Sequence, residues 1–170
     1  MKWFDRRFSF QTPVELYPQF VIRLRGTAAR VDELTRHLSQ PGLARKPESK
    51  WSVQENVGHL LDLEELWDAR LTDFLEGKDV LTPADLENRK THQARHNDTP
   101  PGILLKGFRQ ARNGFLDRLE RLAREDFAKT SRHPRLDTPM RLIDMLQFVA
   151  EHDDHHLARI WELCREAHVH

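Results

Sequence analysis

Two histidines four positions apart, His152 and His156, are the residues of this sequence best suited to binding a metal ion. Residues at positions i and i+4 of an α-helix lie on one face, so both imidazoles can reach the same ion. A third histidine, His59, lies far upstream in a second segment of helical pattern. Three protein ligands with one open coordination position are typical of a catalytic metal site. We therefore expect a metal site formed by His59, His152 and His156.

The helical wheel separates the histidines of the segment 151–160. With Val149 at the centre of the apolar stripe, His156 lies about 20° away, His152 about 60° and His155 about 120°. His152 and His156 are thus expected to face the core, while His155 faces the flank of the helix. Both could instead be core histidines that only pack, but burying two unpaired polar rings is costly. Three neutral imidazoles suit a divalent metal such as Zn, Ni or Fe.

Two other metal sites compete with this interpretation. His152-Asp153-x-x-His156 is similar to the His-Glu-x-x-His pattern of zinc proteases, but aspartate is one methylene shorter than glutamate. A di-iron site in a helical bundle needs two Glu-x-x-His pairs and further glutamates, and the sequence contains no such set.

The elements that must position the histidines are helices. Ser52-Val53-Gln54-Glu55 is a capping-box pattern, and threonine followed by proline at 12–13, 99–100 and 138–139 is typical of helix starts. These signals predict four helices over 13–38, 53–76, 100–123 and 139–167. Each carries a one-sided apolar stripe, so we expect an all-α fold: a four-helix bundle with long connections, forming a single domain over 1–170. The connection 77–98 opens with a pattern for a short helix at Thr82, and loops of this length often line sites.

The composition narrows the class of protein. The chain has 170 residues, with 27 basic and 27 acidic side chains balancing to a net charge of zero, which argues against a nucleic-acid partner. No apolar run is long enough to span a membrane, and the N-terminus lacks the apolar core of a secretion signal. A single cysteine, Cys164, excludes an internal disulfide framework. We therefore expect a cytoplasmic protein.

Several of these segments resemble the DinB-like superfamily of four-helix metalloproteins, which includes the YfiT-type proteins. The resemblance lies in 51–60 (WSVQENVGHL), 151–160 (EHDDHHLARI), 108–112 (FRQAR) and 133–134 (HP), and extends from about 17 to 164. It implies a three-histidine site, matched here by His59, His152 and His156. It also implies an up-up-down-down style of bundle and frequently a homodimer. Relatives include S-transferases that use bacillithiol, mycothiol or glutathione, a maleylpyruvate isomerase and proposed hydrolases.

Two further residues are candidates for roles at the site. Asp153 has a semi-buried wheel position, from which it could orient an imidazole or act in catalysis by accepting a proton. Arg112, at the edge of the third stripe, could bind an anionic group of a substrate or of a low-molecular-weight thiol cofactor. His92 and His96 also have the i, i+4 spacing, but we expect them at the surface. Cys164 lies too far along the helix to reach the metal and is expected to pack.

The reaction that best fits these features is thiol-dependent S-transfer to a small-molecule substrate by a metal-dependent enzyme. Hydrolysis by a metal-bound water is the second possibility, and a non-catalytic metal-binding bundle is the third. An enzyme should combine the metal with a solvent-reachable pocket lined by polar groups.

Overall fold

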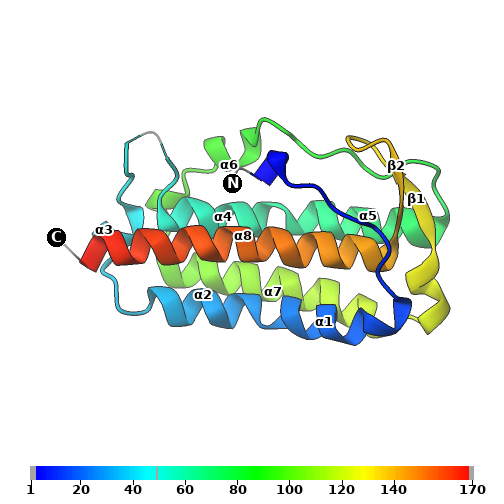
Figure 1. Ribbon diagram of the computed structural model, residues 1–170. Helices are drawn as coiled ribbons and strands as arrows, with labels where there is room; N and C mark the ends of the chain where they lie inside the picture. The colour runs from blue at the N-terminus through cyan, green and yellow to red at the C-terminus, as the bar shows by residue number, and fades with distance from the viewer. Residues whose placement is uncertain (1–2, 49, 169–170) are drawn as a thin grey trace.

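The computed structural model describes residues 3–48 and 50–168, and most of them form helices arranged along one long axis (Figure 1). The α-helices are α1 (Tyr17–Arg25), α2 (Thr27–Thr35), α3 (Gln40–Ala44), α4 (Val53–Asp62), α5 (Glu64–Glu76), α6 (Arg89–Gln93), α7 (Pro101–Leu119) and α8 (Leu142–His168). Short 3-10 turns cover Trp3–Asp5, Val14–Leu16, His96–Asp98 and Arg124–Ala128. The predicted helical bundle is confirmed.

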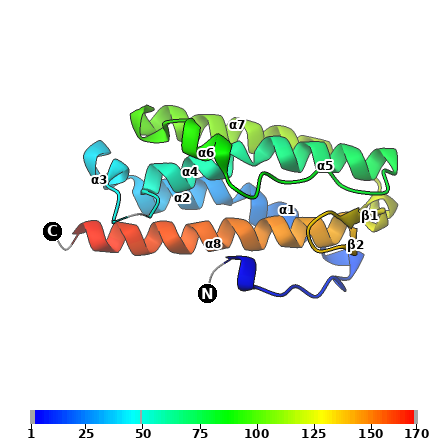
Figure 2. The ribbon, with the colours of Figure 1, turned by 90° about the horizontal axis from the view of Figure 1, so that it is seen from above.

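The four long helices of the bundle are α1–α2, α4–α5, α7 and α8. In Figure 1 the first and last run in one direction, and the second and third run in the opposite direction. The order is therefore up-down-down-up, and the up-up-down-down order implied by the family resemblance is wrong. Because the second and third helices are parallel, the connection between them must return along the whole bundle, which explains its length (Figure 2).

Local capping explains where the second long helix begins and ends. The Ser52 side chain accepts from the Glu55 backbone N–H while the Glu55 side chain accepts from the Ser52 N–H, so the predicted capping box is present. The helix ends at Glu76 because Gly77 adopts φ 70°, a left-handed conformation that favours glycine.

Helical segments begin within a few residues of the three threonine-proline pairs, at Val14, Pro101 and Leu142, but the predicted threonine caps are absent from the described chain. The hydroxyl of Thr12 bonds Gln147 of α8, and the helix that begins at Pro101 has no side-chain cap. Thr138 opens a strand: β1 (Thr130–His133) and β2 (Thr138–Arg141) form an antiparallel hairpin. The short helix predicted at Thr82 is also absent from the described chain; α6 forms further on, at Arg89–Gln93.

The core consists of two apolar clusters that α8 joins. One cluster surrounds residues 142–150 of α8 and includes Trp67 and Phe148; the other surrounds residues 157–164 and includes Leu60 and Phe108. The buried polar residues His152, Asp153 and His156 lie between them on α8. The bundle therefore has a polar layer near its middle, where burial demands partners for each polar group.

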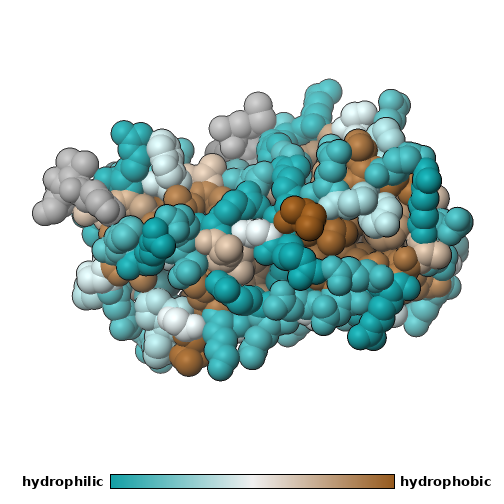
Figure 3. Space-filling model, turned by 90° about the horizontal axis from the view of Figure 1, so that it is seen from below, coloured by the Kyte–Doolittle hydropathy of each residue, from teal (hydrophilic) through white to brown (hydrophobic). Residues whose placement is uncertain are grey.

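The N-terminal segment and the connection 77–98 both lie over this part of the bundle. In Figures 1 and 2 the N-terminal segment runs beside α8, and the connection passes along α4 and α5 to α6. The surface seen from below is mostly hydrophilic, with hydrophobic residues in a few small groups (Figure 3). Within the described residues, every helix is too short or too polar to cross a membrane.

Candidate metal centre

Three histidine rings meet in the polar layer. His59 projects from α4, and His152 and His156 project from the antiparallel α8. Their ring centroids are 5.3 Å apart for His59 and His152, 4.8 Å for His59 and His156, and 4.6 Å for His152 and His156. One nitrogen of each ring lies within 4.8 Å of the others, close enough for all three to hold one metal ion. The helix spacing thus correctly selected the two core-facing histidines of α8.

Hydrogen bonds determine the tautomer of two rings. The Thr91 hydroxyl lies 2.8 Å from Asp62 Oδ2 and must donate its single proton to that carboxylate. Thr91 Oγ1 therefore accepts from His59 Nδ1–H at 3.1 Å. His156 Nδ1 likewise donates to Asn56 Oδ1 at 2.9 Å. Both bonds leave the lone pair on Nε2, which is the arrangement that supporting residues give to metal-binding histidines.

His152 differs because its buried Nδ1 has no hydrogen-bond partner in the described chain. A buried polar atom without a partner costs about 1–3 kcal/mol. The Trp3 ring packs edge-on against His152 with a centroid distance of 4.9 Å, and Trp67 lies 6.0 Å away. Among the described residues the His152 Nδ1 atom therefore remains without a partner, while the ring is packed against the two tryptophans.

Burial keeps all three rings neutral at neutral pH. Desolvation lowers the pKa of His59 to about 4, partly offset by Asp62 and reinforced by neighbouring histidines. Desolvation, together with the other rings of the cluster, also places the pKa of His152 and of His156 well below the usual value. Neutral imidazoles are the form that binds metals such as zinc, nickel or iron. The donor set therefore fits a divalent metal.

His96 contacts Asp62, the residue that accepts from Thr91 behind His59. The surface position predicted for His96 was wrong. It is buried, and its Nε2 lies 2.8 Å from Asp62 Oδ2, the oxygen that also accepts from Thr91. The ring fits because residue 58 is glycine: an added Cβ would lie only 2.2 Å from His96. Gly58 precedes the candidate ligand His59, so the sequence did contain a signal for this close approach. His92 is exposed, as predicted.

Asp153 and Arg112 form a separate buried cluster. Arg112 Nη1 donates to Asp153 Oδ2 at 2.6 Å, and its Nη2 donates to Glu64 Oε1 at 2.6 Å. Thr27 donates to the same Asp153 oxygen at 2.6 Å. Arg112 is 1% exposed and Asp153 0%. The structure thus brings the three histidines together, but it pairs Asp153 and Arg112 with each other instead of exposing them to the pocket. The carboxylate partner that sequence reasoning missed, Glu64, lies one turn before Trp67 on α5.

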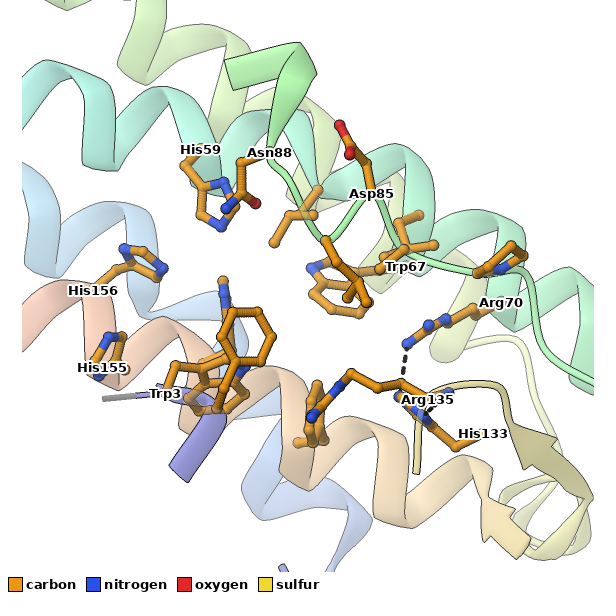
Figure 4. Close-up of a pocket in the computed structure, with 18 of the residues that line it drawn as sticks. Trp3, His59, Trp67, Arg70, Asp85, Asn88, His133, Arg135, His155 and His156 are labelled. Carbon is orange, nitrogen blue, oxygen red and sulfur yellow. Dashed lines mark hydrogen bonds between the residues drawn. The ribbon is translucent and has the colours of Figure 1, made fainter. Parts of the chain in front are cut away.

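A cavity of about 320 Å³ opens beside the three histidines. Aromatic and aliphatic side chains form most of its wall. They are Trp3, Phe4, Trp51, Leu63, Leu66, Trp67, Pro83, Ala84, Leu86, Pro134 and Phe148. Figure 4 shows His59 and His156 at one end and Arg70 and His133 at the other. A largely apolar cavity with a few convergent polar groups is typical of small-molecule sites.

His155 and Cys164 lie where the sequence predicted them, on the flank of α8 and in the core. His155 is half-buried at the pocket wall, on the flank of α8, and its ring centroid is 5.8 Å from that of Trp3. Cys164 is buried in the second apolar cluster, where desolvation raises the pKa of its thiol. It does not line the pocket.

Comparison with known proteins gives a family match and a fold match. The sequence profile described as DinB superfamily matches residues 23–160. A search of curated protein sequences gives no match. Among solved structures, "YfiT from Bacillus subtilis", described as "a probable metal-dependent hydrolase with an unusual four-helix bundle topology", superposes with a TM-score of 0.82 at 20% identity, covering 95% of this chain and 93% of that one. A "mycothiol-dependent maleylpyruvate isomerase" gives 0.68 at 10% identity, covering 89% of this chain and 62% of that one. At these identities the superpositions show a shared fold.

Proposed function

The chain belongs to the DinB superfamily, and from this membership and the three-histidine cluster we propose that it is a metal-dependent enzyme acting on small molecules. The observation that carries the proposal is the convergence of three neutral, buried imidazoles at one end of a cavity of about 320 Å³. Three protein ligands leave a coordination position for a substrate.

His59, His152 and His156 would hold the ion, which we expect to be Zn, Ni or Fe. When bound, the metal would supply Lewis-acid activation of a small molecule. The chain's own contribution is to hold the imidazoles in place: Thr91 fixes the tautomer of His59, and Asn56 fixes that of His156. The aromatic wall places apolar side chains next to the rings, and low local polarity strengthens electrostatic interactions there.

The reaction we favour is thiol-dependent S-transfer, with a low-molecular-weight thiol such as bacillithiol, mycothiol or glutathione as cosubstrate. The isomerase that shares the fold is named as mycothiol-dependent, and the apolar cavity beside the rings can take an apolar electrophile. Hydrolysis is the second candidate because YfiT, the neighbour with the higher TM-score of the two, is described as a probable hydrolase.

Asp153 and Arg112 are best assigned to positioning the site. Asp153 does not line the cavity, but it adjoins His152 in the chain. Two hydrogen bonds from Arg112, at 2.6 and 3.2 Å, hold its carboxylate in place. We propose that this ion cluster holds the polar layer of α8 in register with α7 and α5, which carry Arg112 and Glu64. Direct proton transfer by Asp153, or cofactor binding by Arg112, would require either residue to leave this cluster.

The test of the metal site is metal analysis of protein purified from cells grown without added metal. Wild type should carry close to one divalent ion per chain, and His156→Ala should lose it. His37→Ala, at an exposed histidine of α2's C-terminal turn, is the matched control and should keep the metal. Equal metal content in wild type and His156→Ala would refute the three-histidine assignment.

The test of the reaction is a panel of cellular thiols offered with an electrophilic acceptor, beside a panel of ester and amide substrates. Metal-dependent conjugation with one thiol supports S-transfer, and turnover of the hydrolytic panel alone supports hydrolysis. A metal-loaded protein that turns over neither panel would favour the non-catalytic bundle. Cytoplasmic location and a homodimer remain predictions, testable by fractionation and by sedimentation.

A further inference from the structure

Arg70 is a buried cation without a carboxylate partner. It projects from α5, is 1% exposed, and takes part in no ion pair of the described chain. Its Nε donates to the backbone carbonyl of Thr82 at 2.9 Å, and its guanidinium carbon lies 5.7 Å from the Trp67 ring centroid. Burial lowers the pKa of Arg70 to about 10, opposed by Asp73 and aided by Arg135, so the side chain stays charged at neutral pH. Buried charges normally have partners.

The two carboxylates that could pair with Arg70, Asp73 beside it and Asp85 on the cavity wall, are already engaged. Asp73 accepts from Lys78 Nζ at 2.7 Å and from the Thr82 N–H at 2.6 Å. Asp85, the only carboxylate on the described cavity wall, accepts from the Arg89 N–H at 2.6 Å and caps the start of α6. Neither carboxylate bonds the guanidinium of Arg70.

His133 turns a second donor toward Arg70. His133 Nδ1 accepts from the backbone N–H groups of Arg135 and Leu136, both at 3.2 Å. A neutral imidazole has one donor and one acceptor nitrogen, so the proton must lie on Nε2. His133 Nε2 faces Arg70 Nη1 at 3.4 Å (Figure 4). Two N–H donors therefore point at a common region, and this contact contains no acceptor.

An acceptor from outside the chain would satisfy both donors. Arg70 and His133 line the same cavity as the three histidines, at its opposite end, with the Trp67 ring between them (Figure 4). Arg135, whose guanidinium lies over the Phe4 ring at 5.1 Å, adds a second cation at this end. A planar guanidinium is well matched to a carboxylate, with which it forms charge-assisted hydrogen bonds.

We propose that Arg70 and His133 form an oxyanion subsite that binds the carboxylate of an organic acid, whose apolar part lies along Trp67 toward the three histidines. The placement of the reacting atom near the histidines rests on the proposed function, while the carboxylate subsite itself does not. The substrate class is thus a small acid with an apolar or aromatic middle. The carboxylate can belong to the electrophile or to the thiol.

The test uses 3-phenylpropionate as the probe and its neutral amide, 3-phenylpropanamide, as the matched control, titrated calorimetrically into metal-free protein. Wild type should bind the acid at least about tenfold more tightly than the amide, because charge-assisted bonds are lost in the amide. Arg70→Gln should weaken binding of the acid about tenfold or more and leave the amide unchanged. Arg132→Gln, at an exposed arginine paired with Asp137, should bind like wild type. Inorganic phosphate should compete weakly because it cannot use the apolar wall.

Two further variants separate the possible failures. His133→Leu removes the second donor without touching the charge and should also weaken binding of the acid, which tests the subsite if Arg70→Gln does not fold. His156→Ala should keep acid binding while losing metal, so failure of the metal site and failure of the subsite give different results. Equal binding of acid and amide by wild type, or undiminished acid binding in folded Arg70→Gln, would overturn the proposal. Glutathione and its desulfurised analogue, titrated in parallel, show whether the thiol or the other substrate supplies the carboxylate.

Discussion

Replacement of Thr91 by valine removes the acceptor that fixes the tautomer of His59 and keeps the shape of the side chain. In the metal-free protein His59 can move its proton from Nδ1 to Nε2, so it need not leave a buried donor unpaired. Asp62 keeps its 2.8 Å contact with His96. The free energy of unfolding of the metal-free protein should therefore fall by about 2 kcal/mol, the net value of the two hydrogen bonds that Thr91 makes with His59 and Asp62.

In the metal-bound protein His59 cannot change its tautomer, because a metal on Nε2 leaves the proton on Nδ1. A buried unsatisfied donor costs about 1–3 kcal/mol, and loss of a supporting residue typically weakens metal binding 10–100-fold. These two values agree, since 10–100-fold corresponds to about 1.4–2.8 kcal/mol. We expect Thr91→Val to raise the Kd for zinc by 10–100-fold.

The assay is competition for zinc against a chromophoric chelator, with chemical denaturation of the metal-free protein beside it. The control is Thr35→Val, because the Thr35 hydroxyl donates only to the Val31 carbonyl of its own helix. Thr35→Val should bind zinc like wild type. Unchanged zinc affinity in Thr91→Val, with His156→Ala losing the metal, would show that the Thr91 bond does not orient His59 and would refute this reasoning.

Three further predictions concern the contributions of Arg112, Gly58 and His133 to the free energy of unfolding. Arg112→Met should lower the free energy of unfolding by about 3–5 kcal/mol in urea denaturation, because two buried carboxylates lose their cation; a loss below 1 kcal/mol would contradict this. Gly58→Ala should destabilise the protein by about 1–3 kcal/mol and weaken zinc binding, because the new Cβ would meet His96 at 2.2 Å. Gly114→Ala, where no atom lies within 4 Å of an added Cβ, should instead stabilise by up to about 1 kcal/mol. Burial, with nearby arginines, lowers the pKa of His133 to about 4 in the folded protein. The unfolded chain therefore binds more protons between that pKa and the ordinary value of about 6.5, and stability should rise with pH across this window by up to about 3 kcal/mol from this residue. Denaturation of wild type and His133→Gln across this range should show a shallower slope in the variant, and equal slopes would contradict the assignment.

Local signals in the sequence were sufficient to predict the four long helices and to identify which face of α8 points to the core. The period of the apolar stripes selected His152 and His156 and placed His155 on the flank, because the positions of side chains around a helix follow from its geometry alone. The Ser52 capping box and Gly77 marked the ends of the second long helix for the same local reason. Helical segments begin near all three threonine-proline pairs, but Thr12 and Thr138 do not cap them because tertiary contacts took precedence: Thr12 bonds α8, and Thr138 pairs in a hairpin.

The chemistry of the candidate site depended on contacts between distant parts of the chain. Sequence pattern placed His96 at the surface, but the absence of a side chain at Gly58 lets its ring pack beside His59's helix. The position of Asp153 on the helical wheel suggested a catalytic role. In the structure Asp153 is instead buried and pairs with Arg112, which lies 41 positions away in the chain.

Sequence by itself thus determined which three histidines could form a metal site and on which helices they lie, because ligand spacing and amphipathicity are local properties. Only the tertiary structure decided the direction of the helices, the tautomers of the ligands and the unpaired Arg70 at the far end of the cavity. These depend on which buried polar groups find partners across the bundle, and that pairing is settled by packing between segments far apart in the chain.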